Sequence, residues 1–319
     1  MLKKPEHLSG FFFNDKSQRM THTLFLPVPE YFHFEHTVFS HGWCSLAPFS
    51  LSKEHGALAS TLRIGNAAVP LFFQFSKKRN AIQIIHQQKK NITARTAKSI
   101  ISAAGEIFSL DLRLEEFYRL VSTENDFAWI AKHRTGRMLR AQSFFEDVVK
   151  MILTTNCSWS FTTIMVENLV THCSSTSQPS FPSPEDIAGC SEKFLREKVK
   201  LGYRAPFIRE FSQKVAKGTL QIDHFRTSTA STIELYKELR SIKGVGDYAA
   251  SNLLRLLGRF NYLGLDSWCR NAFAKLHHGE KPATDKQIEK FYARFGEWKG
   301  LVMWVDLTKN WYFDKFPLA

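Results

Sequence analysis

The hydrophobic period changes along this chain, from strand-like before residue 88 to helical after residue 93. Four early runs are rich in aromatic and β-branched residues, as strands are: residues 31–34, 61–64, 69–75 and 82–85. Turn chemistry separates them: Gly42, Gly56, Gly65-Asn66 and residues 78–80. After Thr93 the apolar residues recur at helical spacing, with helices expected over 93–101, 114–120, 141–153 and 291–311, and a loop over 174–184.

This change predicts an α+β protein, with an antiparallel β-rich domain followed by an all-helical body. We place the boundary near residue 110, which gives domains 1–110 and 111–319. A length of 319 residues is comfortable for two domains at roughly 150 residues each. A hydrophobic content of 44% excludes a disordered chain, because enough apolar mass is present for a core.

The formal charge of +13 favours a polyanionic partner. Residues 51–100 carry nine basic residues and one acid, and residues 201–300 carry 17 basic residues and 10 acids. Residues 101–200, between them, are slightly acidic. Charge alone does not separate DNA, RNA and a membrane surface.

The five cysteines are widely separated, and no pair has the spacing of a zinc ribbon. The sequence also lacks the C-terminal four-cysteine cluster that an iron–sulfur site needs. The apolar run between Met1 and Phe13 is too short for a signal peptide, and no stretch approaches the ~20 apolar residues of a membrane span. We expect an intracellular protein with reduced thiols and no membrane association.

Residues 239–250 hold the most informative motif, in which Gly244 and Gly246 flank Val245 between two expected helices. The glycines allow a tight reversal, and the second helix then presents free backbone N–H groups and its positive dipole end. Lys243 adds a point charge. The sequence therefore predicts a phosphate-binding hairpin, and the plain structural alternative is a helix corner with a glycine cap.

Asp266 follows Gly246 by twenty residues, at the start of a further expected helix. The hairpin and this acid together resemble the helix-hairpin-helix (HhH-GPD) DNA glycosylase superfamily, closest to its 8-oxoguanine and 3-methyladenine branches. The resemblance implies that Asp266 stabilises the oxocarbenium-like sugar, or activates water, while the N-glycosidic bond of a flipped nucleotide breaks. Its simpler role is that of a helix N-cap, and one carboxylate can fill both roles.

Residues 201–205 resemble the Gly-Tyr-Arg-Ala segment of the 8-oxoguanine branch. The resemblance implies that Tyr203 wedges into the duplex, that Arg204 contacts the orphaned base opposite, and that Asn156 helps to fill the vacated space. A surface Tyr-Arg pair is the alternative. After Asn156 the chain departs from the family pattern, because it has Trp159-Ser160-Phe161 where family members have an arginine.

Tyr248 lies two residues after Gly246, where bifunctional family members place a lysine that attacks the sugar C1′. A phenol cannot form an imine, and monofunctional members carry an aromatic residue there. Tyr248 therefore implies a water-based mechanism. Trp304 and Asp306 resemble the C-terminal helix that closes the lesion pocket, where Asp306 would suit a base that presents N–H donors or carries positive charge.

The sequence thus predicts a monofunctional base-excision DNA glycosylase, with Asp266 catalytic, Tyr248, Trp304 and Asp306 around an alkylated or oxidised purine, and residues 243–246 on phosphate. A non-catalytic damaged-DNA-binding protein and a glycosylase/lyase with a displaced lysine remain alternatives. We expect a monomer on double-stranded DNA. No cofactor is expected, apart from a monovalent cation that the hairpin carbonyls could hold. The compartment is the cytoplasm or nucleoid of a bacterium, or the nucleus of a eukaryote.

Overall fold

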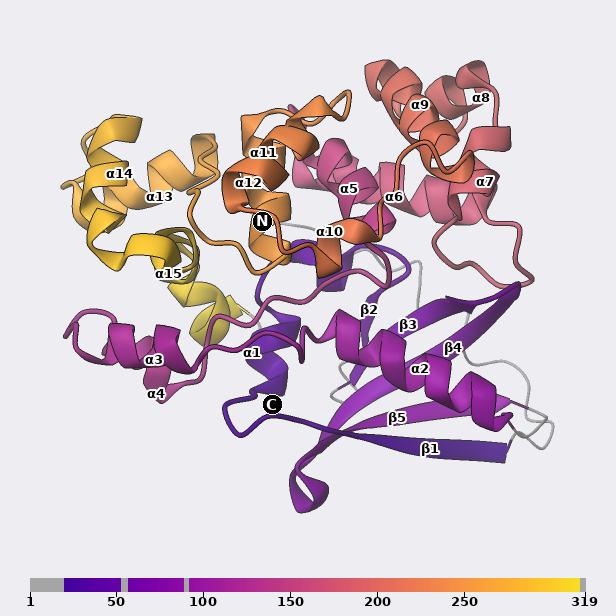
Figure 1. The fold of residues 1–319 in the computed structure, drawn as a ribbon, viewed down its shortest axis with the longest axis horizontal. Helices are drawn as coiled ribbons and strands as arrows, with labels where there is room; N and C mark the ends of the chain where they lie inside the picture. Colours follow the sequence, from indigo (N-terminus) through magenta and orange to yellow (C-terminus); the bar gives the residue numbers. More distant parts are fainter. Residues whose placement is uncertain (1–19, 53–56, 89–91, 316–319) are drawn as a thin grey trace.

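The computed structural model describes residues 20–52, 57–88 and 92–315. Gly56 and the segment from Met1 to Phe13 lie outside these described residues. The expected α+β order is confirmed: an antiparallel sheet comes first and a helical body follows (Figure 1). The strands are β1 (Met20–Pro27), β2 (Ser50–Ser52), β3 (Ala57–Ile64), β4 (Ala67–Ser76) and β5 (Ala81–Gln88).

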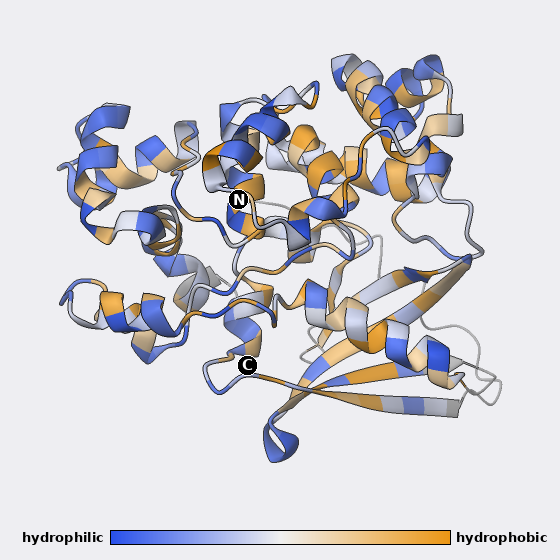
Figure 2. Ribbon diagram, viewed as in Figure 1, coloured by the Kyte–Doolittle hydropathy of each residue, from blue (hydrophilic) through white to orange (hydrophobic). Residues whose placement is uncertain are grey.

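The sheet has the strand order β1-β5-β4-β3-β2, and every neighbouring pair is antiparallel. Helix α2 (Ala94–Ile107) crosses one face of the sheet (Figure 1). Its Ile100, Ala104 and Ile107 are buried, and Figure 2 shows hydrophobic residues on the strands beneath it. The turn between β4 and β5 is hydrophilic, and it contains three consecutive basic residues, Lys77–Arg79.

The strand expected over residues 31–34 is wrong. Helix α1 (Phe34–Val38) begins there, because His33 caps it by accepting a 3.2 Å hydrogen bond at Nδ1 from the His36 backbone N–H. The aromatic residues that suggested a strand are instead buried in the core, where Phe32 and Phe34 both contact the Phe108 ring.

Short helices build the rest of the chain. They are α3 (Glu115–Ser122), α4 (Ala128–Lys132), α5 (Phe144–Thr154), α6 (Trp159–Cys173), α7 (Pro184–Gly189), α8 (Glu192–Glu197), α9 (Ala205–Ala216), α10 (His224–Thr227), α11 (Thr232–Ser241), α12 (Asp247–Leu256), α13 (Ser267–His277), α14 (Asp285–Tyr292) and α15 (Lys299–Leu307). The helix expected over 291–311 is interrupted, because Gly296 adopts φ 54° between α14 and α15.

Hydrogen bonds join the N-terminal part to the helical body. The Trp43 indole Nε1 donates to Asp147 Oδ1 on α5 over 2.8 Å, and Arg63 on β3 pairs with Asp186 on α7. The buried apolar residues of both parts form one continuous cluster. Among the described residues, no helix is both long enough and apolar enough to cross a membrane.

Candidate active site

The hairpin joins α11 to α12 as the glycine spacing predicts. Ser231 and Glu234 form a capping box that starts α11, and the chain reverses at Gly244, which has φ 92°. Gly246 is the N-cap of α12, so the free N–H groups of the first turn of α12 follow it directly. Arg240 Nη1 donates to the Val245 carbonyl over 2.8 Å and braces the turn.

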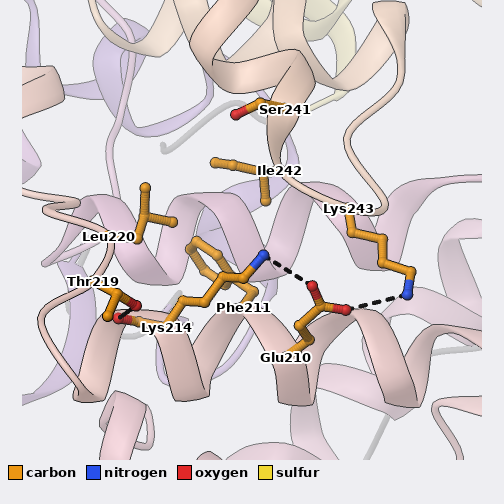
Figure 3. A pocket seen from close by; sticks show the side chains of 8 residues that line it. All are labelled: Glu210, Phe211, Lys214, Thr219, Leu220, Ser241, Ile242 and Lys243. Atoms are coloured by element: carbon orange, nitrogen blue, oxygen red, sulfur yellow. Dashed lines mark hydrogen bonds and ion pairs between the residues drawn. The ribbon is translucent and has the colours of Figure 1, made fainter.

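Lys243 is held by an acid at the rim of this hairpin. Its Nζ lies 3.1 Å from Glu210 Oε2, and Lys214 Nζ lies 2.9 Å from Oε1 of the same carboxylate (Figure 3). Hydrogen bonds from Lys214 and Lys243 lower the pKa of Glu210. The three side chains line a surface pocket of about 260 Å³. Lys243, which the sequence predicts to contact phosphate, is thus paired with a carboxylate.

Asp266 stands at the N-terminus of α13, as predicted. Its Oδ1 accepts a 2.7 Å hydrogen bond from the Cys269 backbone N–H, and the Cys269 thiol also interacts with this carboxylate. The segment that leads into Asp266 packs tightly on α12. Gly264 has φ 66°, and an added Cβ at this residue would lie 2.9 Å from Asn252 Nδ2. The position of the carboxylate is thereby fixed at the N-terminus of the helix.

Tyr248 on α12 lies close enough to Asp266 for the charge of the carboxylate to act on its phenol. Burial raises the pKa of the Tyr248 phenol, and the negative charge of Asp266 raises it further. The hydroxyl of Thr154, the last residue of α5, interacts with the same phenol. The structure therefore brings together Tyr248 and Asp266, which the sequence assigned to one site.

Arg255 is a site residue that the sequence analysis missed. It is 2% exposed, it donates from Nη2 to the Leu263 carbonyl, and its guanidinium carbon lies 5.0 Å from the centroid of the Trp304 ring. Burial lowers its pKa, while the Cys269 thiol, Tyr248 and Asp266 act to raise it. The signal that could have found it is helical spacing, because Tyr248, Asn252 and Arg255 follow at i, i+4 and i+7 on one face of α12.

Trp304 on α15 closes this side of the site. Its Nε1 donates to the Ser40 carbonyl over 2.8 Å, which ties the C-terminal helix to the N-terminal part. Its ring centroid lies 6.0 Å from that of Trp268 and 5.7 Å from that of Trp311. Trp268 follows Asp266 by two residues, so an aromatic cluster adjoins the carboxylate.

Asp306 does not join this cluster, although the resemblance placed it in the lesion pocket. Its Oδ2 accepts hydrogen bonds from Tyr292 Oη at 2.5 Å and from His277 Nε2 at 2.6 Å. His277 is the last residue of α13, at the opposite end of the helix from Asp266. Residues 304 and 306 are roughly 200° apart around the α15 axis, so the two side chains leave the helix on different faces.

The predicted duplex-contacting residues lie close together, but they are not equally exposed. Asn156 is exposed and adopts φ 49°, and Tyr203 is 48% exposed. Arg204 is only 3% exposed, because its guanidinium turns inward, donates to the Thr155 carbonyl and lies 4.4 Å from the Tyr203 ring centroid. Arg204 thus supports the Asn156 turn from behind, and it does not present its guanidinium to solvent.

Trp159, which stands near the position of an expected arginine, rests on the N-terminal part of the chain. An added Cβ at Gly42 would lie 2.3 Å from Trp159 Cη2, so the indole occupies the space that a side chain at Gly42 would need. Trp159 is still 45% exposed. Sequence spacing gave no sign of this contact, because the two residues belong to different parts of the fold. Within the described ranges, no group of three or more His, Cys, Asp or Glu residues is arranged to hold a metal ion.

The fold combines a helix-hairpin-helix motif, α11 and α12, with an aspartate at the N-terminus of α13. Residues 149–298 match the family described as HhH-GPD superfamily base excision DNA repair protein. Within the helical part, the chain is therefore similar to the HhH-GPD superfamily over these residues.

Individual proteins resemble the chain over most of its length. A probable N-glycosylase/DNA lyase of Methanothermobacter thermautotrophicus is 25% identical over 217 residues, which cover 60% of this chain and 68% of that protein. An 8-oxoguanine glycosylase/lyase of Clostridium acetobutylicum aligns with a TM-score of 0.68 at 17% identity, over 91% of this chain and 97% of that one. A 3-methyladenine DNA glycosylase of Archaeoglobus fulgidus gives 0.67 at 17% identity, over 92% and 99%.

Proposed function

We propose that this protein is a monofunctional DNA glycosylase that flips a damaged purine out of duplex DNA and hydrolyses its N-glycosidic bond with Asp266. The observation that carries the proposal is the Asp266 carboxylate, which the Cys269 backbone N–H fixes at the N-terminus of α13, next to the buried phenol of Tyr248. A damaged-DNA-binding protein without catalytic activity has no need of a carboxylate held in this way.

In the proposed reaction, the bond between C1′ of the sugar and the base nitrogen breaks, and a water oxygen bonds to C1′. The base leaves with the bonding electron pair and takes up one proton, while the water loses one of its two protons and becomes the hydroxyl group on C1′. Asp266 stabilises the positive charge that develops on the sugar, and its carboxylate orients the water or accepts its proton. The product is an abasic site in an uncut strand.

The absence of lyase activity is argued from Tyr248, which occupies the position of the family's imine-forming lysine. Two lysines come under consideration as substitutes. Lys243 is paired with Glu210 at the hairpin rim, and Lys150 is fully buried, with its Nζ 2.6 Å from Glu146 Oε1. A neutral amine at C1′ is needed for an imine, and neither ion pair supplies one there.

DNA recognition is assigned to the hairpin and to the turn that Arg204 supports. The N–H groups at the start of α12 bind phosphate without reading sequence. Tyr203 and Asn156 fill the space that the flipped nucleotide leaves, because an exposed aromatic ring can stack on the neighbouring bases. Binding then weakens steeply as salt rises.

The test is a set of duplexes that carry alkylated, deaminated or oxidised purines, with products compared before and after hot alkali. Strand breaks that require alkali support the proposal. Breaks without alkali, together with an adduct trapped by borohydride, would establish the glycosylase/lyase alternative, which the name of the Methanothermobacter relative favours. Duplex binding without excision of any lesion would leave the non-catalytic alternative.

A further inference from the structure

Arg255 places a fixed positive charge beside the proposed catalytic carboxylate. Its Nη1 donates to Asn252 Oδ1, and its Nη2 donates to the Leu263 carbonyl, three residues before Asp266. The guanidinium also lies 5.0 Å from the Trp304 ring centroid. A side chain that is 2% exposed and held on three sides cannot swing away into solvent.

The other titratable groups near this pair are neutral or internally paired. Burial raises the pKa values of Tyr248 and Cys269, and burial lowers the pKa of His41 to about 4. The two buried carboxylates near His41 each have a basic partner: Glu146 pairs with Lys150, and Asp147 pairs with Arg226, which also binds Glu106 at the surface. Arg270 also interacts with Asp266, but it is paired with Asp285. Among the described residues, the charges that remain without an ion-pair partner at the site are the negative one on Asp266 and the positive one on Arg255.

This balance changes what the site can attract. A lone carboxylate beside aromatic rings would favour a cationic base through Coulomb attraction and cation–π contact. Here Arg255 cancels the net charge, and the Trp304 ring already carries a cation on one face. A purine made cationic by alkylation would meet a like charge at short range.

We propose that Arg255 is a specificity-determining residue that directs the site to electrically neutral damaged purines, oxidised or deaminated, and against cationic alkylated purines. This inference rests on the proposed glycosylase function. It narrows the substrate class that the sequence left open. It also differs from the expectation that Asp306 contacts a positively charged base.

The experiment compares single-turnover excision by the wild-type protein from matched duplexes that carry 7-methylguanine, which is cationic, or 8-oxoguanine or hypoxanthine, which are neutral. Each rate is divided by the spontaneous rate of base loss from the same duplex, because a cationic base leaves more easily without any enzyme. At least one neutral base should show the larger enhancement. A larger enhancement for 7-methylguanine than for both neutral bases overturns the inference and leaves the glycosylase function intact, whereas no excision of any base overturns the function itself.

Two substitutions test the residue directly. Arg255→Met removes the charge and should raise the ratio of cationic to neutral enhancement by roughly tenfold, while Arg255→Lys should keep it near the wild-type value. Arg137→Met is the matched control, because Arg137 is also 2% exposed but donates to the Ser109 and Leu112 carbonyls. An unchanged ratio in a folded Arg255→Met protein contradicts the assignment. The wild-type comparison decides the question should that variant fail to fold.

Discussion

The backbone N–H of Cys269 donates a 2.7 Å hydrogen bond to Oδ1 of Asp266, so one carboxylate both caps α13 and faces the proposed site. These two roles can be separated, because asparagine and aspartate cap helices about equally well.

Asp266→Asn should therefore reduce excision by roughly 100- to 1,000-fold, the loss typical of removing one transition-state electrostatic contact. The melting temperature and the affinity for undamaged duplex should stay close to those of the wild type. Single-turnover kinetics and thermal denaturation measure the two effects. Excision that survives within a few-fold would remove Asp266 from the mechanism.

Tyr248→Lys should convert the protein into one that forms a covalent intermediate. A lysine at this half-buried position has its pKa lowered by desolvation, so its neutral amine can attack C1′ and be trapped by borohydride. Gel analysis should reveal a protein–DNA adduct for this variant and none for Tyr248→Phe. An adduct with the wild-type protein would contradict the monofunctional assignment.

Gly244→Ala should destabilise the hairpin by about 1–3 kcal/mol, because a side chain at φ 92° is strained and the new Cβ would lie 3.1 Å from Phe207 Cβ. The matched variant is Gly246→Ala, where φ is −85° and the nearest atom to the new Cβ is 4.0 Å away. Gly246→Ala should keep most of its stability but bind duplex more weakly, since the methyl group stands where phosphate approaches. Equal melting temperatures for the two variants would refute this account of the turn.

Tyr203→Ala and Arg204→Met should have opposite profiles. Tyr203 is exposed, so its loss should leave stability within about 0.5 kcal/mol but reduce the preference for damaged over undamaged duplex roughly tenfold. Arg204→Met leaves the Thr155 carbonyl without its donor and should cost about 1–3 kcal/mol of stability. Competition binding and denaturant unfolding separate the two, and a fully stable Arg204→Met protein would argue against the supporting role.

Glu210→Gln should strengthen duplex binding at low salt, because it releases Lys243 and Lys214 for phosphate. The slope of log affinity against log salt should steepen by about one for each lysine that reaches a phosphate. Glu116→Gln makes the same change of net charge on α3, where Glu116 pairs with Arg119 at 3.7 Å, and it serves as the control. Equal slopes for both variants would show that Lys243 does not contact the DNA backbone.

Local spacing was enough to predict the parts of the site that are local in the chain. The glycines of the hairpin and the acid at the start of α13 follow backbone rules that act within a few residues. The sheet was predicted for the same reason, since alternation and turn residues mark β3, β4 and β5 directly.

What the sequence could not predict depends on packing between distant segments. Arg255 resembles an ordinary helix-surface arginine until α12 packs against residues 263–266 and buries it. The partners of Asp306 could not be predicted either, because the rotation of α15 that turns Trp304 toward Arg255 turns Asp306 toward His277. The strand predicted over residues 31–34 was wrong for a related reason, since aromatic residues occur equally well in a strand and in a buried turn.

The hydrogen bond from Trp304 to the Ser40 carbonyl spans 264 residues of sequence. A ribosome releases the N-terminal partner long before it reaches α15, and N-terminal regions generally fold first. The loop around Gly42 must therefore wait, with Trp159 already available to cover it, until almost the whole chain has been synthesised. A nascent or truncated protein can thus contain the complete hairpin before the proposed active site is complete, so the proposed DNA-binding element forms earlier in synthesis than the proposed catalytic site.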